Sequence, residues 1–139
     1  EYNRRYYQEI LDVVKAYKDY SILGHLDVIK RYDLNGEIEL EKIKDLIEQI
    51  FEVVIADGKG IELNTSSRAY HLKSLMPSRE ILELYHDMGG KIITIGSDAH
   101  NADRVGDRVM ESQKILKEIG FNGIYTFDQM KPKFHEFKF

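Results

Sequence analysis

The sequence has 139 residues and a mass of 16.3 kDa, which fits one domain spanning 1–139 and gives room for a sizeable core. Its 42% apolar content and net charge of −4 exclude a disordered tail and a basic nucleic-acid-binding surface. No apolar run reaches the roughly 18–20 residues of a membrane span. The absence of cysteine excludes disulfides and thiolate–zinc sites and favours a cytoplasmic location.

Helices and short strands alternate in the first half of the chain. Apolar residues three and four positions apart predict amphipathic helices over residues 6–17 and 40–54. Short apolar runs after them predict buried strands over residues 21–24 and 61–64. The chain begins at Glu1, without a methionine, and we therefore expect it to be a piece of a longer protein.

The second half of the chain repeats this pattern. Pro77 opens a predicted helix that ends at residues 89–90, and a strand follows over residues 92–95. A helix over residues 105–119 and a strand over residues 123–126 complete the set. Strands that recur at roughly 30-residue intervals indicate an α/β fold of parallel βα units. The spacing alone leaves open whether these units form a small open sheet or half of a barrel.

Polar residues follow three of the predicted strands directly, and the carboxyl ends of parallel strands meet at one edge of a sheet. We therefore expect His25, Asp98 and His100 to converge there. Carboxylate and imidazole groups both suit Zn²⁺, Mn²⁺ or Fe²⁺. The polar residues at the strand ends include His25, Asp27, Asn64, Ser97, Asp98 and His100.

Each candidate residue also has a purely structural interpretation. Asp98 could cap a nearby helix, and a lone His25 would more often be a hydrogen-bonded core histidine than a metal ligand. Lys30, Arg31 and Arg68 would ordinarily be solvated surface charges. The occurrence of histidine and carboxylate together at strand ends favours a site. The sequence has no glycine-rich phosphate loop, no serine nucleophile elbow and no cysteine nucleophile.

Three segments together resemble the PHP (polymerase and histidinol phosphatase) family, most closely its histidinol-phosphatase branch. They are GHLDVIKRY at 24–32, ELNTS at 62–66 and IGSDAH at 95–100. The resemblance covers nearly all of the chain and corresponds to the C-terminal half of the family. It implies half of a distorted (βα)₇ TIM-like barrel and a cluster of divalent metal ions (Zn, Mn or Fe). Because the family's N-terminal half carries further ligands, we expect the cluster to be incomplete in this chain.

The resemblance also implies a role for nine residues, and a metal-bound hydroxide rather than a protein group as the nucleophile. The implied metal ligands are His25, Asp98 and His100; the implied phosphate-binding residues are Lys30, Arg31 and Arg68; the implied polar supports are Asp27, Asn64 and Ser97.

The implied activity is metal-dependent hydrolysis of L-histidinol phosphate to histidinol and phosphate in histidine biosynthesis, with this chain inactive alone. The implied partners are a small phosphorylated substrate and the missing N-terminal half of the barrel, with no nucleic acid or membrane. One alternative is a PHP-family phosphoesterase with another substrate. A second is a non-catalytic half-barrel that self-associates. Half a barrel leaves sheet edges unpaired, and we therefore expect a homo-oligomer.

Overall fold

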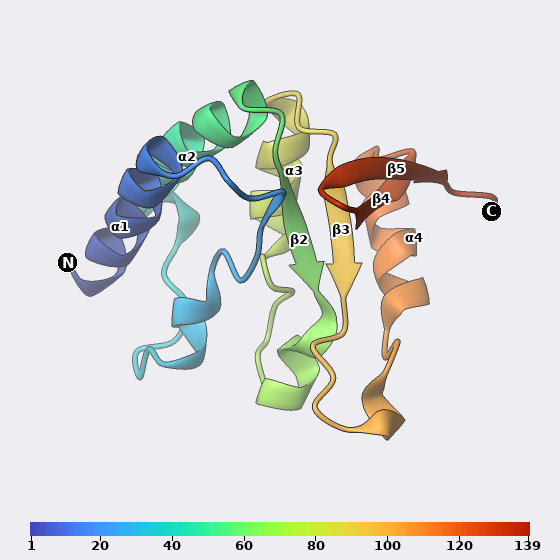
Figure 1. Cartoon of the computed structure of the whole chain (residues 1–139). Coiled ribbons are helices and arrows are strands. Elements are labelled where there is room, and N and C mark those ends of the chain that lie inside the picture. The colour runs from blue at the N-terminus through green and yellow to red at the C-terminus, as the bar shows by residue number, and fades with distance from the viewer.

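The computed structural model describes all 139 residues as a three-stranded parallel sheet, four α-helices and a two-stranded hairpin (Figure 1). Four short 3-10 helices, η1 to η4, lie in the loops. The main elements are α1 Tyr2–Ala16, β1 Ile22–Leu23, α2 Lys44–Ala56, β2 Gly60–Asn64, α3 Arg79–Asp87, β3 Ile93–Gly96, α4 Val109–Ile119, β4 Gly123–Asp128 and β5 Lys131–Glu136. The 3-10 helices are η1 Val28–Arg31, η2 Leu40–Lys42, η3 Thr65–Tyr70 and η4 Ala102–Arg104.

The parallel sheet has the strand order β1-β2-β3, so strands that are consecutive in the sheet are connected through α2 and α3. Ile61 pairs with Ile93 and Leu63 pairs with Ile95, which puts these four side chains on the same face. The predicted α/β class with parallel βα units is thereby confirmed.

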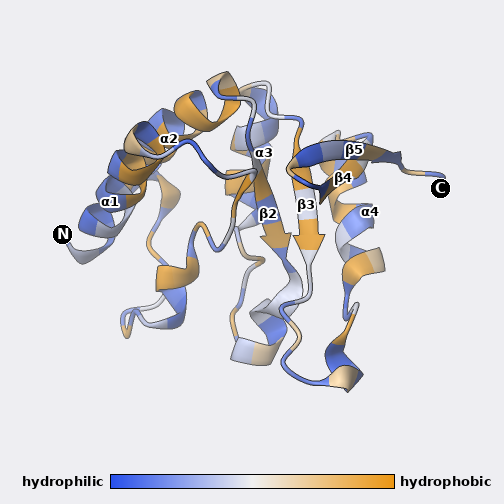
Figure 2. Ribbon diagram, in the orientation of Figure 1, coloured by the Kyte–Doolittle hydropathy of each residue, from blue (hydrophilic) through white to orange (hydrophobic).

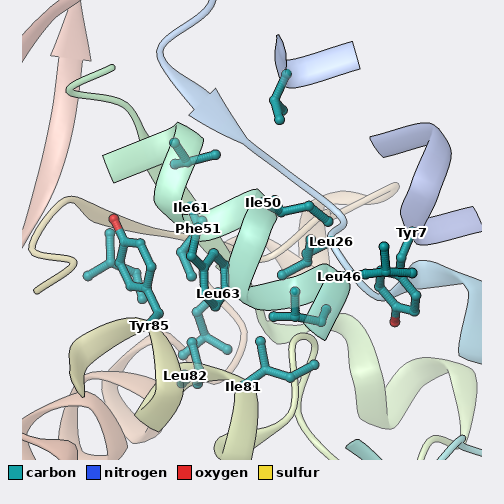
Figure 3. Close-up of a cluster of buried hydrophobic side chains, with 14 of the residues drawn as sticks. Tyr7, Leu26, Leu46, Ile50, Phe51, Ile61, Leu63, Ile81, Leu82 and Tyr85 are labelled. Atoms are coloured by element: carbon teal, nitrogen blue, oxygen red, sulfur yellow. The ribbon is translucent and has the colours of Figure 1, made fainter. Parts of the chain in front are cut away.

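The helix-covered face of the sheet carries the hydrophobic core. Ile61, Leu63 and Ile93 are fully buried there, and Phe51 of α2 meets Tyr85 of α3 edge to face with ring centroids 5.0 Å apart (Figure 3). Figure 2 shows apolar residues on α2 and on the strands β2 and β3. Burial of this surface removes apolar area from water and stabilises the fold. No helix has the length and hydropathy needed to cross a bilayer.

The opposite face of the sheet has a different composition. Alternation along the strands puts Glu62 and Thr94, which are paired in register, on this face, and both are only partly buried. In Figure 1, α3 lies behind the sheet and no helix covers the near face of β2 and β3. The side of the sheet that the helices leave open is therefore partly polar.

One prediction about the fold is wrong. The strand at 123–126 exists, as β4, but it pairs in antiparallel fashion with β5 and does not extend the parallel sheet. β4 lies beside β3 without pairing to it. The hairpin turns at Gln129 and Met130, whose φ angles of 50° and 63° are left-handed. This two-residue turn lacks the glycine that usually marks it, so β5 could not be recognised from a turn signal.

Candidate functional site at the carboxyl ends of the strands

His25 and Asp98 meet at the carboxyl ends of β1 and β3, with His25 Nε2 lying 3.5 Å from Asp98 Oδ2. Both residues have left-handed backbones, with φ angles of 54° and 52°. This conformation costs a side-chain-bearing residue roughly 1–2 kcal/mol. Strain of this kind is concentrated at functional sites, where the surrounding structure enforces it.

Glu62 is a member of this cluster that the sequence interpretation missed. Its Oε1 lies 3.4 Å from His25 Nδ1, so the imidazole stands between two carboxylates. The neighbouring strands make room for it through Gly24 and Gly96. A Cβ atom at these positions would come within 3.5 Å and 2.7 Å, respectively, of the Glu62 carboxylate oxygens. A lone carboxylate inside an apolar strand was the signal available in the sequence.

Arg31 supplies the positive charge of the cluster. Its side chain is only 9% exposed, and its Nη2 donates to Ser66 Oγ at 2.8 Å and lies 3.5 Å from Asp98 Oδ2. The guanidinium stacks over the Tyr70 ring, 3.7 Å from the ring centroid. Its Nε is buried and has no hydrogen-bond partner. The guanidinium is thus held in place while one of its donors stays unused.

A cavity of about 220 Å³ lies beside Asp98 and is also lined by Ser66, Tyr70, His100 and Arg104. His100 belongs to this wall, but its ring does not approach His25. Its Nδ1 lies 2.8 Å from the backbone carbonyl of Asp98 and 4.0 Å from the Asp98 carboxylate, and the side chain is 75% exposed. The expected convergence therefore holds for His25 and Asp98, with His100 at the periphery.

Lys30 and Asp27 form a buried ion pair, with Lys30 Nζ 2.9 Å from Asp27 Oδ2. Lys30 also donates to Ser74 Oγ at 2.9 Å and to the carbonyl of Leu75, and the backbone N–H of Ser78 donates to Asp27. Burial raises the pKa of Asp27, and the Lys30 charge opposes that rise. Neither residue contacts the His25–Asp98 cluster through a hydrogen bond or ion pair. Their assignments to phosphate binding and polar support stay predictions.

The other predicted residues surround the cluster. Asn64 is fully buried; its Nδ2 donates to Glu62 at 3.3 Å, and its Oδ1 accepts from the backbone N–H and the hydroxyl of Ser66. It therefore links Glu62 to the serine that holds the guanidinium. Ser97 Oγ accepts a backbone N–H from the loop that follows η4. Arg68 is exposed on η3 and forms no ion pair.

His25, Glu62 and Asp98 offer one imidazole and two carboxylates, which are the ligand types of Zn²⁺, Mn²⁺ and Fe²⁺. No group of three histidine, aspartate or glutamate side chains is arranged in a way that could hold a metal ion. The chain by itself does not provide a fitting metal site, although it provides residues of the right chemistry.

Comparison with known proteins finds similarity to one family. The PHP domain family matches residues 1–66. A probable histidinol-phosphatase of Thermotoga maritima is 35% identical over 121 residues, which are 87% of this chain and 50% of that protein. The histidinol-phosphatase of Lactococcus lactis is 30% identical over 134 residues, which are 94% of this chain and 49% of that protein.

A solved structure agrees with these sequence matches. The crystal structure of the Lactococcus lactis histidinol phosphate phosphatase, in complex with zinc, L-histidinol and phosphate, superimposes with a TM-score of 0.78 at 27% identity. The superposition covers 94% of this chain and 50% of that one.

The first 66 residues thus match the PHP domain family, and the α/β fold matches half of a histidinol phosphate phosphatase. Within that family the chain is homologous to the histidinol-phosphatases, and it spans about half the length of the curated relatives it matches. The resemblance predicted from the three sequence motifs is confirmed, as is the correspondence to half of a TIM-like barrel.

Proposed function

We propose that this chain is one half of a metal-dependent phosphomonoesterase that hydrolyses L-histidinol phosphate to histidinol and phosphate in histidine biosynthesis. The observation that carries the proposal is the meeting of His25, Asp98 and the buried Arg31 at the carboxyl ends of the strands. Support for the substrate comes from the homologous Lactococcus phosphatase, whose crystal contains L-histidinol and phosphate.

In this proposal, Arg31 binds the phosphate group of the substrate. A guanidinium forms strong, charge-assisted hydrogen bonds to phosphate oxygens. Arg31 is held by Ser66 and Tyr70, so little conformational freedom is lost when it binds an anion. The adjoining cavity also has Arg104 on its wall, where its Nη2 is paired with Asp107 Oδ2 at 3.1 Å. Lys30 and Arg68 remain proposed contributors with weaker support from their contacts.

The proposed cofactor is a divalent Zn, Mn or Fe ion, and the zinc in the Lactococcus crystal supports this class. The chain contributes His25, Glu62 and Asp98 toward such an ion, with His100 nearby, and further ligands have to come from polypeptide outside this chain. The proposed partners are therefore a small phosphorylated substrate and the other half of the barrel. The proposed compartment is the cytoplasm, supported by the absence of cysteine.

A second candidate function is a non-catalytic half-barrel that self-associates. It is favoured by the lack of any complete metal-ligand group and by the uncovered face of the sheet that carries Glu62 and Thr94. In that case His25 and Asp98 would be remnants of a site. The two candidate functions differ in whether His25 and Asp98 take part in phosphate hydrolysis once the other half of the barrel is supplied.

A chimera tests the proposed function. This chain replaces the matched half of the Lactococcus phosphatase, and phosphate release from L-histidinol phosphate is measured with Zn²⁺ or Mn²⁺. We expect turnover that His25→Ala abolishes and that a matched His135→Ala change in the hairpin preserves. A folded chimera that releases no phosphate would favour the remnant interpretation. A chimera that prefers other phosphomonoesters would keep the reaction and change the substrate.

A further inference from the structure

A second, larger cavity of about 600 Å³ lies between α1, the loop that follows η1 and the first turn of α3. Asn3 and Tyr7 of α1 form one wall, and Ser78 and Ile81 at the start of α3 form another. It shares no lining residue with the cavity beside Asp98. Of the residues proposed above to bind phosphate, only Lys30 lines this cavity.

The wall of this cavity is strongly acidic. Five carboxylates and two basic side chains line it, an excess of three negative charges. Both basic groups are already paired: Lys30 with Asp27, and Arg79 with Glu83 and Glu118 on the protein surface. The carboxylates are Asp27, Glu37, Glu39, Glu41 and Glu80. The electrostatic potential of the cavity therefore favours a cation with more than one positive charge.

One buried polar group on this wall has unused hydrogen-bonding capacity. Asp27 is 3% exposed; its Oδ2 accepts from Lys30 and Ser78, whereas its Oδ1 has no partner. Tyr7, which is 2% exposed, lines the same cavity. Buried polar groups are normally paired, so an unpaired oxygen on a residue that lines this cavity indicates a missing partner. An ammonium N–H would satisfy the free carboxylate oxygen.

The remaining wall is apolar, which distinguishes between kinds of cation. Ile29 and Ile43 are buried there, and Ile38 and Leu40 lie beside them. A divalent metal ion needs a shell of oxygen ligands, and no metal-holding group of side chains exists in the chain. An alkyl chain with ammonium ends matches both the apolar wall and the carboxylates.

We propose that this cavity binds an aliphatic polyamine, with an ammonium group between Asp27 and Glu37 and the alkyl chain along Ile29 and Ile38. Glu37 is positioned for this by Ser74, whose hydroxyl donates to its carboxylate oxygens at 2.6 and 2.8 Å. Ser74 also accepts from Lys30, which joins Glu37 to the Asp27 pair. The inference does not depend on the proposed phosphatase activity, since His25, Asp98 and Arg31, which carry that activity, do not line this cavity.

Calorimetric titration of the full chain with 1,4-diaminobutane and with spermidine tests the proposal. The matched uncharged probe is 1,4-butanediol, and MgCl₂ is the metal arm. Tyr7→Phe removes only the hydroxyl and Glu37→Gln removes one exposed charge, so both variants keep the buried Asp27–Lys30 pair. Glu9→Gln on the exposed side of α1 is the control of equal charge change. Circular dichroism verifies that every variant is folded.

We expect saturable binding of both amines, with each of Tyr7→Phe and Glu37→Gln weakening it about tenfold, as the loss of one hydrogen bond or charge contact does. Glu9→Gln binds as the unmodified chain does. No heat with either amine at millimolar concentration would overturn the proposal. Equal binding of 1,4-butanediol or of Mg²⁺, or binding unchanged by both cavity variants, would overturn it as well.

Discussion

The short segment after β1 contributes to two clusters of charged side chains, a buried ion pair and the strand-end cluster. The two clusters differ in burial, in contact distances and in backbone conformation. Asp27 and Lys30 turn into the protein and lie 2.9 Å apart, with side chains only 4% and 6% exposed. His25 and Arg31 turn to the other side and lie at looser distances of 3.5 Å from Asp98. The buried pair is closely hydrogen-bonded, whereas the strand-end cluster combines left-handed backbones at His25 and Asp98 with one unused donor, Arg31 Nε.

Neighbouring charged residues on this segment serve two different ends, one structural and one chemical. A buried ion pair is needed to keep two desolvated charges compensated, and removing one partner is costly. A cluster that is strained and incompletely paired contributes little to stability and is available to a ligand. On this basis stability should depend on Asp27 and Lys30, and chemistry on His25, Asp98 and Arg31.

The largest expected effect comes from breaking the buried pair. Asp27→Ala leaves Lys30 buried without a counter-charge, and we expect the free energy of unfolding to fall by about 3–5 kcal/mol in urea denaturation. Asp12→Ala on the exposed side of α1 is the matched control and should change it by less than about 0.5 kcal/mol. A loss for Asp27→Ala no larger than that of the control would contradict the structural role of the pair.

The strand-end cluster should behave in the opposite way. His25→Gly removes a left-handed side-chain-bearing residue, so we expect the free energy of unfolding to stay level or rise by about 1 kcal/mol. In the chimera with the Lactococcus half, the same change should abolish phosphate release. Gln129→Gly relieves an equally left-handed position in the hairpin and should leave turnover intact. Equal turnover of the His25→Gly and Gln129→Gly chimeras would contradict a chemical role for His25.

Two glycine substitutions test whether Gly24 and Gly96 leave room for the Glu62 carboxylate. A Cβ atom at Gly96 would lie 2.7 Å from Glu62 Oε2, whereas one at Gly24 would make an ordinary 3.5 Å contact with Oε1. We expect Gly96→Ala to lower the unfolding free energy by about 1–3 kcal/mol through overpacking, and Gly24→Ala to lower it by less. The reverse order in thermal or urea unfolding would show that the glycines do not serve this carboxylate.

The smallest effect concerns a surface pair between helices, Arg4 of α1 and Asp45 of α2. The hydrogen bond from Arg4 lowers the pKa of Asp45 to about 2. A lowered acidic pKa stabilises the fold above the ordinary value near 4, and the benefit disappears as the pH falls through about 2. The stability difference between the unmodified chain and Asp45→Asn should therefore vanish at the acidic end of a pH series. A difference that stays constant down to the lowest pH would rule out this linkage.

Part of the site could be predicted from the sequence because strand ends can be recognised from apolar runs. His25 and Asp98 each follow such a run closely, and parallel pairing brings them together. Glu62 was missed because a single charge within a strand normally faces solvent. The burial of Lys30 was missed because it depends on Ser74 and Leu75, which are distant in sequence and unrelated to any local pattern.

The fold, like the site, could be predicted only in part from the sequence. Parallel βα units follow from alternating periodicity, and the three strands of the sheet were found close to their actual bounds. The hairpin was not predicted because β5 is exposed along its whole length and contains Pro132, so it lacks the apolar alternation of a strand. Only its pairing with β4 identifies it, and that pairing is a tertiary property.

The most direct test of the central claim is phosphate release by the isolated chain. The purified 139-residue protein is incubated with L-histidinol phosphate and Zn²⁺ or Mn²⁺, beside the complete Lactococcus enzyme and the chimera. We expect negligible release by the chain alone and clear release by the chimera, because the chain holds only part of a metal-ligand set. Turnover by the isolated chain at the rate of the complete enzyme would contradict this expectation.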